Sequence, residues 1–203
     1  KYVGIRVAEN YRFCIFTSPV GAYYSRPVRV FVSDKYVRAA PGGAGFAKAA
    51  GNYGAAMMPT WEVQKMGYDQ LLWLDAIEHK YFQEIGTMNV FFVIDGVLIT
   101  PGLDQGTILE GVTRDSLIQL AQDEGYVVQE RDVSVDEVIH AYNDGKLQDM
   151  FGAGTAAVVS YIGGFHYKGV DYELPPVEKR EVSNKLRARL MDIKSGLVVD
   201  KFN

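Results

Sequence analysis

A lysine with unusual neighbours is the first residue that could carry out covalent chemistry. Lys48 is the only charged residue between positions 40 and 52, where the other residues are Ala, Gly, Pro, Phe and Asn. Such surroundings disfavour the ammonium form, and the neutral amine is a nucleophile that forms a Schiff base with a carbonyl compound. A lysine can also lay its stem along the surface and keep its charge in water, so the loop composition leaves both interpretations open.

Two further places could bind an anion through backbone amides. The segment 111–113 leads into a predicted helix over 114–124, and the free N–H groups and the dipole at a helix start favour negative charge. Gly154 and Thr155 supply a turn with amides and a hydroxyl. A helix cap and a hairpin turn would use the same residues, and both roles can hold together.

Other motifs for catalysis or metal binding are incomplete. Gly43 and Gly45 stand before Lys48, but a third glycine is absent and no Gly-Lys-Ser/Thr occurs, so neither a dinucleotide fingerprint nor a phosphate loop is predicted. The three histidines are far apart and lack metal-ligand spacing, so we expect no metal site. No serine has the glycine spacing of a nucleophile elbow.

The single cysteine and a group of basic residues receive structural interpretations. Cys14 lies in a predicted strand over 11–17 without a charged activator beside it, so we expect a small buried hydrophobe. One cysteine forms no intrachain disulfide, and this usage is typical of cytosolic proteins. A solvated strand face is the interpretation of a mild basic cluster formed by Arg26, Arg29, Lys35 and Arg38.

Four helices are predicted around these residues. The glycine-rich segment 40–52 is expected to approach something closely, and Asn52 then caps a helix over 53–66 that ends at Gly67. The helix over 114–124 stops at Gly125. The other two are predicted from the capping box Ser134-x-x-Glu137 to Asn143 and over 178–194.

Strands make up most of the remaining pattern. The strongest hairpin signal is Asp95-Gly96 between 88–94 and 97–100, and 165–169 resembles a further hairpin. Other strands are predicted over 11–17, 27–33, 71–74, 126–133, 149–151 and 156–162. Because neither a strict βαβ alternation nor a Greek-key spacing fits, the fold class is mixed α and β.

Length and composition limit the class of protein. The 203 residues, 48% hydrophobic and 23% charged, predict a globular chain of about one domain. A net charge of −4 argues against nucleic acid as a partner. No stretch approaches the ~18 apolar residues of a membrane span, since Asp95 interrupts the best run. The first residue is Lys1 rather than Met, and we expect a fragment that lacks its N-terminal part.

Five segments in order resemble blocks of one enzyme family. They are 47–54 around Lys48 (AKAAGNYG), 71–75 (LLWLD), 84–91 (EIGTMNVF), 107–115 (TILEGVTRD) and 151–156 (FGAGTA). With the upstream segment 18–23, they are similar to the branched-chain amino-acid aminotransferases, pyridoxal-phosphate (PLP) enzymes of fold type IV. The Gly-Thr-Met-Asn form of the third block indicates the branched-chain subgroup.

The resemblance implies roles at the cofactor ring. Lys48 would bind the cofactor covalently through its amine and then move a proton between the amino-acid α-carbon and the cofactor, which makes it the catalytic residue. Glu84 would pair with the pyridine nitrogen, and Tyr53 would donate to the phenolic oxygen. Leu109 would lie against the ring.

The resemblance also implies roles at the two ends of the bound molecule. The phosphate would be held by Val112, Thr113 and Thr155, at the two anion sites described above. Thr87 and Ala156 would face the substrate carboxylate. Tyr23, and Ile5 with it, would help to line the pocket for the substrate side chain.

The resemblance further implies a fold and an activity. The fold would be a barrel-like sheet with peripheral helices, in which 1–25 is an interdomain connection with the first strand and 26–203 is the large PLP-binding domain. The complete enzyme would interconvert leucine, isoleucine or valine and 2-oxoglutarate with branched 2-oxo acids and glutamate, as a cytoplasmic homodimer. Two alternatives remain, a same-fold aminotransferase for another apolar or aromatic amino acid and a non-catalytic binding or oligomerisation fragment.

Overall fold

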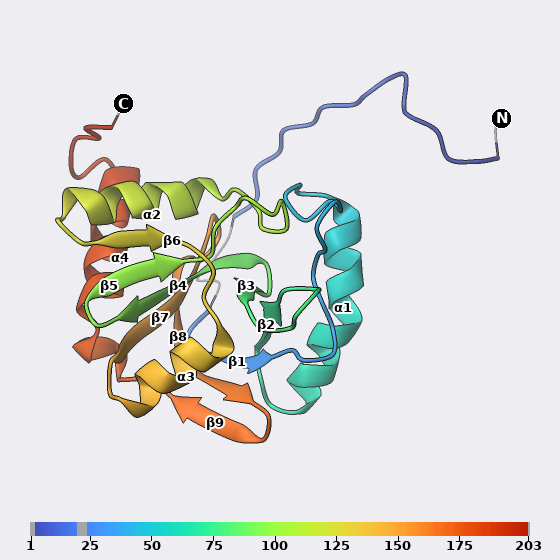
Figure 1. The fold of residues 1–203 in the computed structure, drawn as a ribbon. Helices are drawn as coiled ribbons and strands as arrows, with labels where there is room; N and C mark the ends of the chain where they lie inside the picture. The colour runs from blue at the N-terminus through green and yellow to red at the C-terminus, as the bar shows by residue number, and fades with distance from the viewer. Residues whose placement is uncertain (1–2, 20–23, 203) are drawn as a thin grey trace.

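The computed structural model describes residues 3–19 and 24–202, and in these ranges the strands form one mixed sheet (Figure 1). The strands are β1 (Val28–Val32), β2 (Gln70–Leu74), β3 (Phe82–Ile85), β4 (Met88–Ile94), β5 (Val97–Thr100), β6 (Val128–Glu130), β7 (Leu147–Gly154), β8 (Val158–Tyr167) and β9 (Val170–Glu173). Six of them follow the order β3-β2-β1-β8-β7-β4, and β3 also pairs with β4. This last pairing closes a six-stranded barrel, which confirms the predicted barrel-like sheet.

Strand directions within the barrel are mixed. β1 runs parallel to β2 and to β8, whereas the other pairings of the ring are antiparallel. Outside the ring, β5 and β6 extend the sheet from β4, and β9 forms a hairpin with β8. The barrel therefore carries two short additions on its outside.

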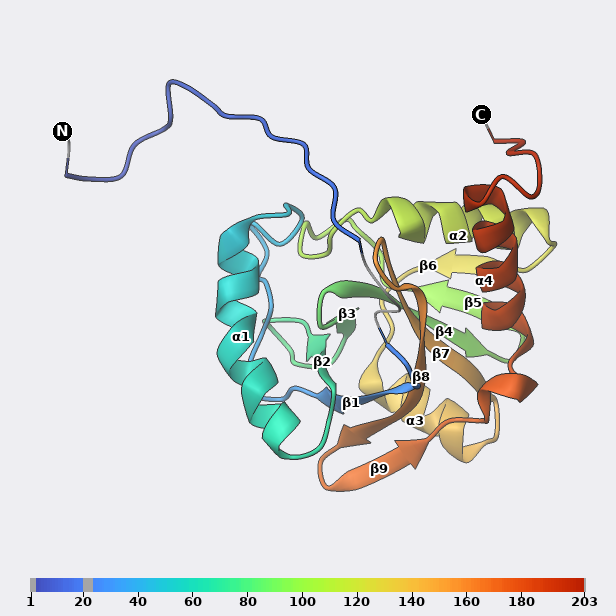
Figure 2. The ribbon, with the colours of Figure 1, turned by 180° about the vertical axis from the view of Figure 1, so that it is seen from behind.

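Helices cover the barrel on several sides (Figures 1 and 2). In the described ranges they are α1 (Ala50–Lys65), α2 (Val112–Asp123), α3 (Val135–Asn143) and α4 (Glu181–Lys194), with a 3₁₀ turn at Val177–Lys179. Figure 2 shows α2 and α4 together over one side and α1 alone on the opposite side. The predicted peripheral helices are thus present, and the fold class is confirmed.

Alternation along the strands separates the interior of the barrel from its outer faces. Val30, Leu72, Val90 and Ile162, from four strands of the ring, belong to one buried cluster that also packs on α3. The residues one position away point outward. Phe91 joins a cluster with α2 and α4, and Leu71 and Trp73 join Val63 of α1.

Local signals in the sequence predicted several elements correctly. Asp95 and Gly96 have φ of 52° and 77°, the left-handed conformations that a two-residue hairpin turn requires. Ser134 accepts a hydrogen bond from the Glu137 amide at 3.1 Å and starts α3 as predicted. The hairpin expected over 165–169 is the β8–β9 turn.

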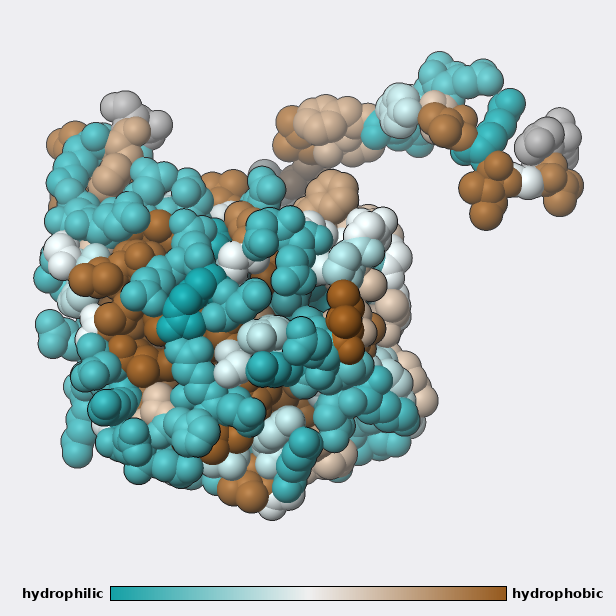
Figure 3. Space-filling model, in the orientation of Figure 1, coloured by the Kyte–Doolittle hydropathy of each residue, from teal (hydrophilic) through white to brown (hydrophobic). Residues whose placement is uncertain are grey.

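The predicted strand over 11–17 is wrong, and so is the predicted burial of Cys14. Residues 11–17 pair with no strand in the described part of the chain, and Cys14 is exposed. Figure 3 shows this N-terminal segment apart from the body, with apolar side chains on its surface. Strand propensity reflects packing on neighbouring strands, and here the segment meets none.

Two other differences concern the ends of elements. The strand expected over 126–133 shortens to Val128–Glu130, because only three residues pair with β5. β3, which the element prediction lacked, has all four residues buried and shows no polar alternation. A strand buried on both faces lacks the period-two signal of a half-exposed strand.

Candidate active site

Glu84 is a carboxylate in the wall of the barrel. It lies on β3 opposite Asn89 of β4, and only 3% of its surface is exposed. Its Oε1 accepts hydrogen bonds from the Leu109 amide at 2.7 Å and from Arg38 Nη2 at 3.1 Å. A buried acid at this position can stay ionised only because donors reach it.

Burial and neighbouring charges act in opposite directions on the pKa of Glu84. Desolvation is the largest cause and raises this pKa from 4.5 to about 7, while the Arg38 guanidinium, the Leu109 amide and the Lys48 ammonium all lower it. The carboxyl group is therefore balanced between its two forms near neutral pH. A carboxyl group in that state can share a proton with a basic nitrogen placed beside it.

Arg38 is a functional-site residue that the sequence interpretation missed. Its side chain is 9% exposed, and Nη2 also donates to the carbonyl oxygens of Gly45 at 2.9 Å and Thr107 at 2.6 Å. The interpretation as a solvated basic face is therefore wrong for Arg38. It suits Arg26, whose exposed side chain pairs with Asp69.

Asn52 organises the loop that carries Lys48. Its Nδ2 donates to the carbonyl oxygens of Ala44 at 2.7 Å and Ala47 at 2.9 Å. The predicted role as helix cap is wrong, because α1 starts at Ala50 with Ala49 as its N-cap and without a side-chain cap. The amide of Asn52 acts as a donor to the loop instead of as an acceptor for the helix.

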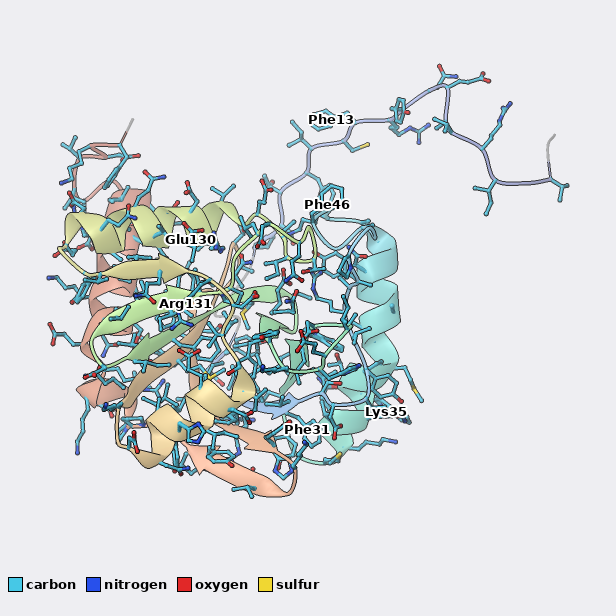
Figure 4. All side chains as sticks on the ribbon, in the orientation of Figure 1. Phe13, Phe31, Lys35, Phe46, Glu130 and Arg131 are labelled. Carbon is cyan, nitrogen blue, oxygen red and sulfur yellow. The ribbon has the colours of Figure 1, made fainter. Side chains whose placement is uncertain are left out.

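The glycine-rich loop makes the expected close approach, and its target is another loop. A Cβ on Gly45 would lie 2.5 Å from the Thr107 carbonyl oxygen and 2.5 Å from Ala39 Cβ. The Phe46 amide donates to the Gly106 carbonyl oxygen at 3.1 Å, and Figure 4 shows the Phe46 side chain near the start of α1. The Lys48 loop is thereby attached to the loop that precedes α2.

A small cavity joins four of the predicted site residues. Tyr53, Glu84, Thr87 and Leu109 line it. The other lining residues are Arg38, Ala47, Asn52, Ala56 and Gly86. Lys48 follows Ala47 directly, is exposed, and acts electrostatically on Glu84. An amine, a phenol and a buried carboxylate therefore converge on one place from the loop, α1 and β3.

The start of α2 lies next to this cavity. Asn89 Nδ2 donates to the Leu109 carbonyl oxygen at 2.9 Å, two residues before Gly111, the N-cap of α2. No side chain caps this helix, so the amides of its first turn, where Val112 and Thr113 lie, are available to an anion. Val112 is 81% exposed, so a ligand can approach the turn from solvent.

Thr155 and Ala156 lie in the exposed turn between β7 and β8. Because Ala153 pairs with Asn89, this turn projects from the same end of the barrel as the start of β4. Ala156 lines a second, larger cavity of about 490 Å³ and is absent from the one that contains Thr87. Tyr23 lies outside the described residues.

Two negative findings apply to the described part of the chain. No group of three or more His, Cys, Asp and Glu side chains could hold a metal ion there. Among the helices of residues 3–19 and 24–202, none has the length and hydropathy needed to cross a membrane.

Comparison with known proteins connects this geometry to a family. The sequence profile of the amino-transferase class IV family matches residues 5–160. A probable branched-chain-amino-acid aminotransferase of Staphylococcus epidermidis is 45% identical over 204 residues, which cover 98% of this chain and 57% of that protein. The chain therefore spans a little over half the length of this curated relative.

Solved structures agree with the sequence comparison. The branched-chain aminotransferase of Thermoproteus uzoniensis with norvaline has a TM-score of 0.74 and 30% identity, covering 88% of this chain and 55% of that one. A second branched-chain amino acid aminotransferase, from T.th. and with pyridoxamine 5′-phosphate, has a TM-score of 0.68 and 30% identity, covering 84% and 52%. The barrel and its helices are thus similar to those of these proteins.

Proposed function

The chain belongs to the class IV aminotransferases, and from this premise we propose that it is the cofactor-binding part of a PLP-dependent branched-chain aminotransferase. Residues 26–203 would form the large domain, and 1–25 the connection and first strand that precede it. The complete enzyme would transfer the amino group of leucine, isoleucine or valine to 2-oxoglutarate. The names of the relatives and of the structural neighbours support this choice of substrates.

The residues around the small cavity fit PLP chemically. An exposed lysine amine can react with an aldehyde, a buried carboxylate can pair with a pyridine nitrogen, and uncapped helix amides can hold a phosphate. When bound, PLP would supply an electron-accepting ring that stabilises the charge left when the amino-acid α-proton departs. Pyridoxamine 5′-phosphate in the T.th. neighbour supports this assignment.

Lys48 and Glu84 would divide the proton chemistry between them. Lys48 Nζ would hold the cofactor, take the proton from the substrate α-carbon and return it to the other partner of the exchange. Glu84 would accept a hydrogen bond from the protonated pyridine nitrogen, held in place by Arg38 and the Leu109 amide. Tyr53 would donate its phenolic O–H to the phenolic oxygen of the cofactor.

The convergence of Lys48 and Glu84 is the observation that carries this proposal. The two residues are 36 positions apart by their numbers, on a loop and on β3, and the Lys48 charge nevertheless acts on the buried Glu84 carboxyl group. A decayed, non-catalytic fragment would have no need to keep this pair. Val112, Thr113 and Thr155 would hold the phosphate, and Thr87 and Ala156 would face the substrate carboxylate.

The assembly and location of the protein are also proposals. We infer a cytoplasmic homodimer whose ligands are small amino acids and 2-oxo acids, with neither nucleic acid nor membrane as partner. A net charge of −4 and the single cysteine support this inference. The rival substrates are other apolar or aromatic amino acids, and a panel of amino-acid donors tested with the complete protein separates them.

Borohydride trapping tests the function. The protein, in the full length in which it is expressed, is incubated with PLP, reduced and digested, and the peptide with the pyridoxyl mass is identified. We expect the mass on Lys48 and a visible absorbance band that reduction removes. A Lys48→Ala variant should show neither. Absence of the band and of the mass from the wild-type protein would refute the aminotransferase proposal.

A further inference from the structure

Asn89 occupies a buried position between the two halves of the proposed cofactor site. It is the second residue of β4 and is 6% exposed. It pairs across the sheet with Glu84 on one side and with Ala153 on the other. Its side chain therefore comes from the strand that separates the Glu84 carboxylate from the β7–β8 turn.

Glu84 and Asn89 together hold the two sides of one residue. The Leu109 N–H donates to Glu84 Oε1 at 2.7 Å, and the Leu109 carbonyl oxygen accepts from Asn89 Nδ2 at 2.9 Å. Because both side chains come from paired positions of β3 and β4, the position of Leu109 is fixed by the register of the barrel. Few rearrangements of this loop would keep both hydrogen bonds.

The other end of the Asn89 amide lies against the N-cap of α2. A Cβ placed on Gly111 would come within 2.2 Å of Asn89 Oδ1. Gly111 has φ −74° and ψ 127°, a conformation open to any residue, so the backbone does not require glycine here. The requirement comes from Asn89, whose Oδ1 takes the space of the missing side chain.

The first turn of α2 is anchored from its other side as well. Arg114 is 3% exposed, and its Nη2 donates to the Pro101 carbonyl oxygen at 2.9 Å and to Glu130 Oε2 at 2.7 Å. Arg114 thus ties the turn to the β5–α2 and β6 region. Asn89 is the connection between this turn and Leu109.

We propose that Asn89 is a positioning residue that aligns the uncapped amides of α2 with the phosphate of a cofactor whose ring lies beside Leu109. The proposal rests on the proposed function. One carboxamide spans Leu109 and Gly111, so it fixes the separation between the ring end and the phosphate end of the site. Asn89 itself would touch neither the substrate nor the reacting atoms.

Comparison of PLP with pyridoxal isolates the phosphate end. Dissociation constants for both aldehydes are measured by absorbance with the wild-type, Asn89→Ala and Gln148→Ala proteins in full-length form. Gln148 is the control, because its side chain also bonds a backbone group, the Gly96 amide at 2.7 Å in the β4–β5 turn. We expect Asn89→Ala to reduce the preference for PLP over pyridoxal by about tenfold, the size of one lost hydrogen bond, and Gln148→Ala to preserve it.

Two results would contradict different parts of the argument. If Asn89→Ala weakened both aldehydes by one factor, or changed neither, the positioning role would be refuted while the proposed function stood. If the wild-type protein bound neither aldehyde at Lys48, the proposed function would fail, and the role of Asn89 with it. Thermal midpoints of all variants show whether each protein is folded.

A double-mutant cycle provides a second readout that a general loss of packing would not reproduce. Gly111→Ala alone should reduce the PLP preference, because its Cβ displaces the Asn89 amide. In the Asn89→Ala background the same Cβ has space, so adding Gly111→Ala should cause no further reduction. Additive losses would show that the two residues act independently and would overturn the proposal.

Discussion

Arg38 and Glu84 form a buried ion pair, with Nη2 3.1 Å from Oε1 and side chains that are 9% and 3% exposed. The same Nη2 bonds carbonyl oxygens of the Lys48 loop and of the loop before α2. The pair therefore sets the charge of the acid and joins the two loops that flank the cavity. Removing one partner of such a pair leaves the other buried without compensation.

Replacement of Arg38 should change the titration of Glu84. Arg38→Met removes the largest of the influences that oppose burial, so the pKa of Glu84 should rise above its value of about 7, by about 1 to 3 pH units. Carbon-13 NMR of labelled glutamate in the cofactor-free protein measures it. Arg26→Met, at an exposed ion pair, is the matched control and should leave the midpoint unchanged. An unaltered Glu84 midpoint in Arg38→Met would show that the guanidinium has no electrostatic role.

The raised pKa of Glu84 predicts how stability depends on pH. The folded protein holds the proton more tightly than the unfolded chain, whose carboxyl pKa is 4.5, so the contribution of protonated Glu84 is complete below pH 4.5. It is lost as the pH rises through about 7 and amounts to about 3 kcal/mol. Glu84→Gln should remove this component.

Denaturant unfolding of the cofactor-free wild-type and Glu84→Gln proteins between pH 4.5 and 8 tests the sign. The free energy of unfolding of the variant should gain on that of the wild type as the pH rises. Asp95→Asn, in the exposed β4–β5 turn, controls for the general effect of removing a carboxylate. A difference between Glu84→Gln and wild type that is constant with pH would contradict the assignment.

Trp73 supports the turn that forms one side of the cavity. Its Nε1 donates to the Gly86 carbonyl oxygen at 3.0 Å, and its ring is fully buried between β2 and α1. Trp73→Phe retains an aromatic ring but leaves the Gly86 carbonyl without its donor, so we expect a loss of about 1 to 3 kcal/mol in the free energy of unfolding. Trp61→Phe, at a side chain that is 53% exposed, should cost much less. Equal losses in the two variants would refute the role of this hydrogen bond.

Local signals predicted the elements better than they predicted the contacts between them. Asp95-Gly96 and Ser134-x-x-Glu137 carry their information within four residues, and both formed as expected. Closure of the barrel through β3 and β4 depends on neighbours from the whole ring, and strand patterns do not encode it. The segment 11–17 shows the opposite error, since strand-like residues form no strand without a partner.

The candidate site divides in the same way. Sequence motifs selected Tyr53, Glu84, Thr87 and Leu109, which the structure gathers around one cavity. Arg38 was missed because its main partners, Glu84 and Thr107, are 46 and 69 residues away. A lone arginine before a glycine-rich loop gives no sign that it will be buried.

Gly45 offers a test of the contact between the two loops. Its conformation lies outside the left-handed region, so an alanine is excluded only by space, since a Cβ would meet the Thr107 carbonyl oxygen and Ala39 Cβ, each at 2.5 Å. Gly45→Ala should separate the loops, destabilise the protein by about 1 to 3 kcal/mol and weaken PLP binding at Lys48. Thermal unfolding and PLP titration measure the two effects.

Gly54→Ala is the matched control for that variant, because a Cβ at Gly54 meets nothing within 4 Å and the residue lies inside α1. Alanine is the better helix former, so this change should stabilise the protein by about 0.5 to 1 kcal/mol. The two glycine-to-alanine changes should thus have opposite signs. If Gly45→Ala were as stable as the wild type and bound PLP equally well, the close approach of the Lys48 loop to Thr107 would have no energetic importance for the site.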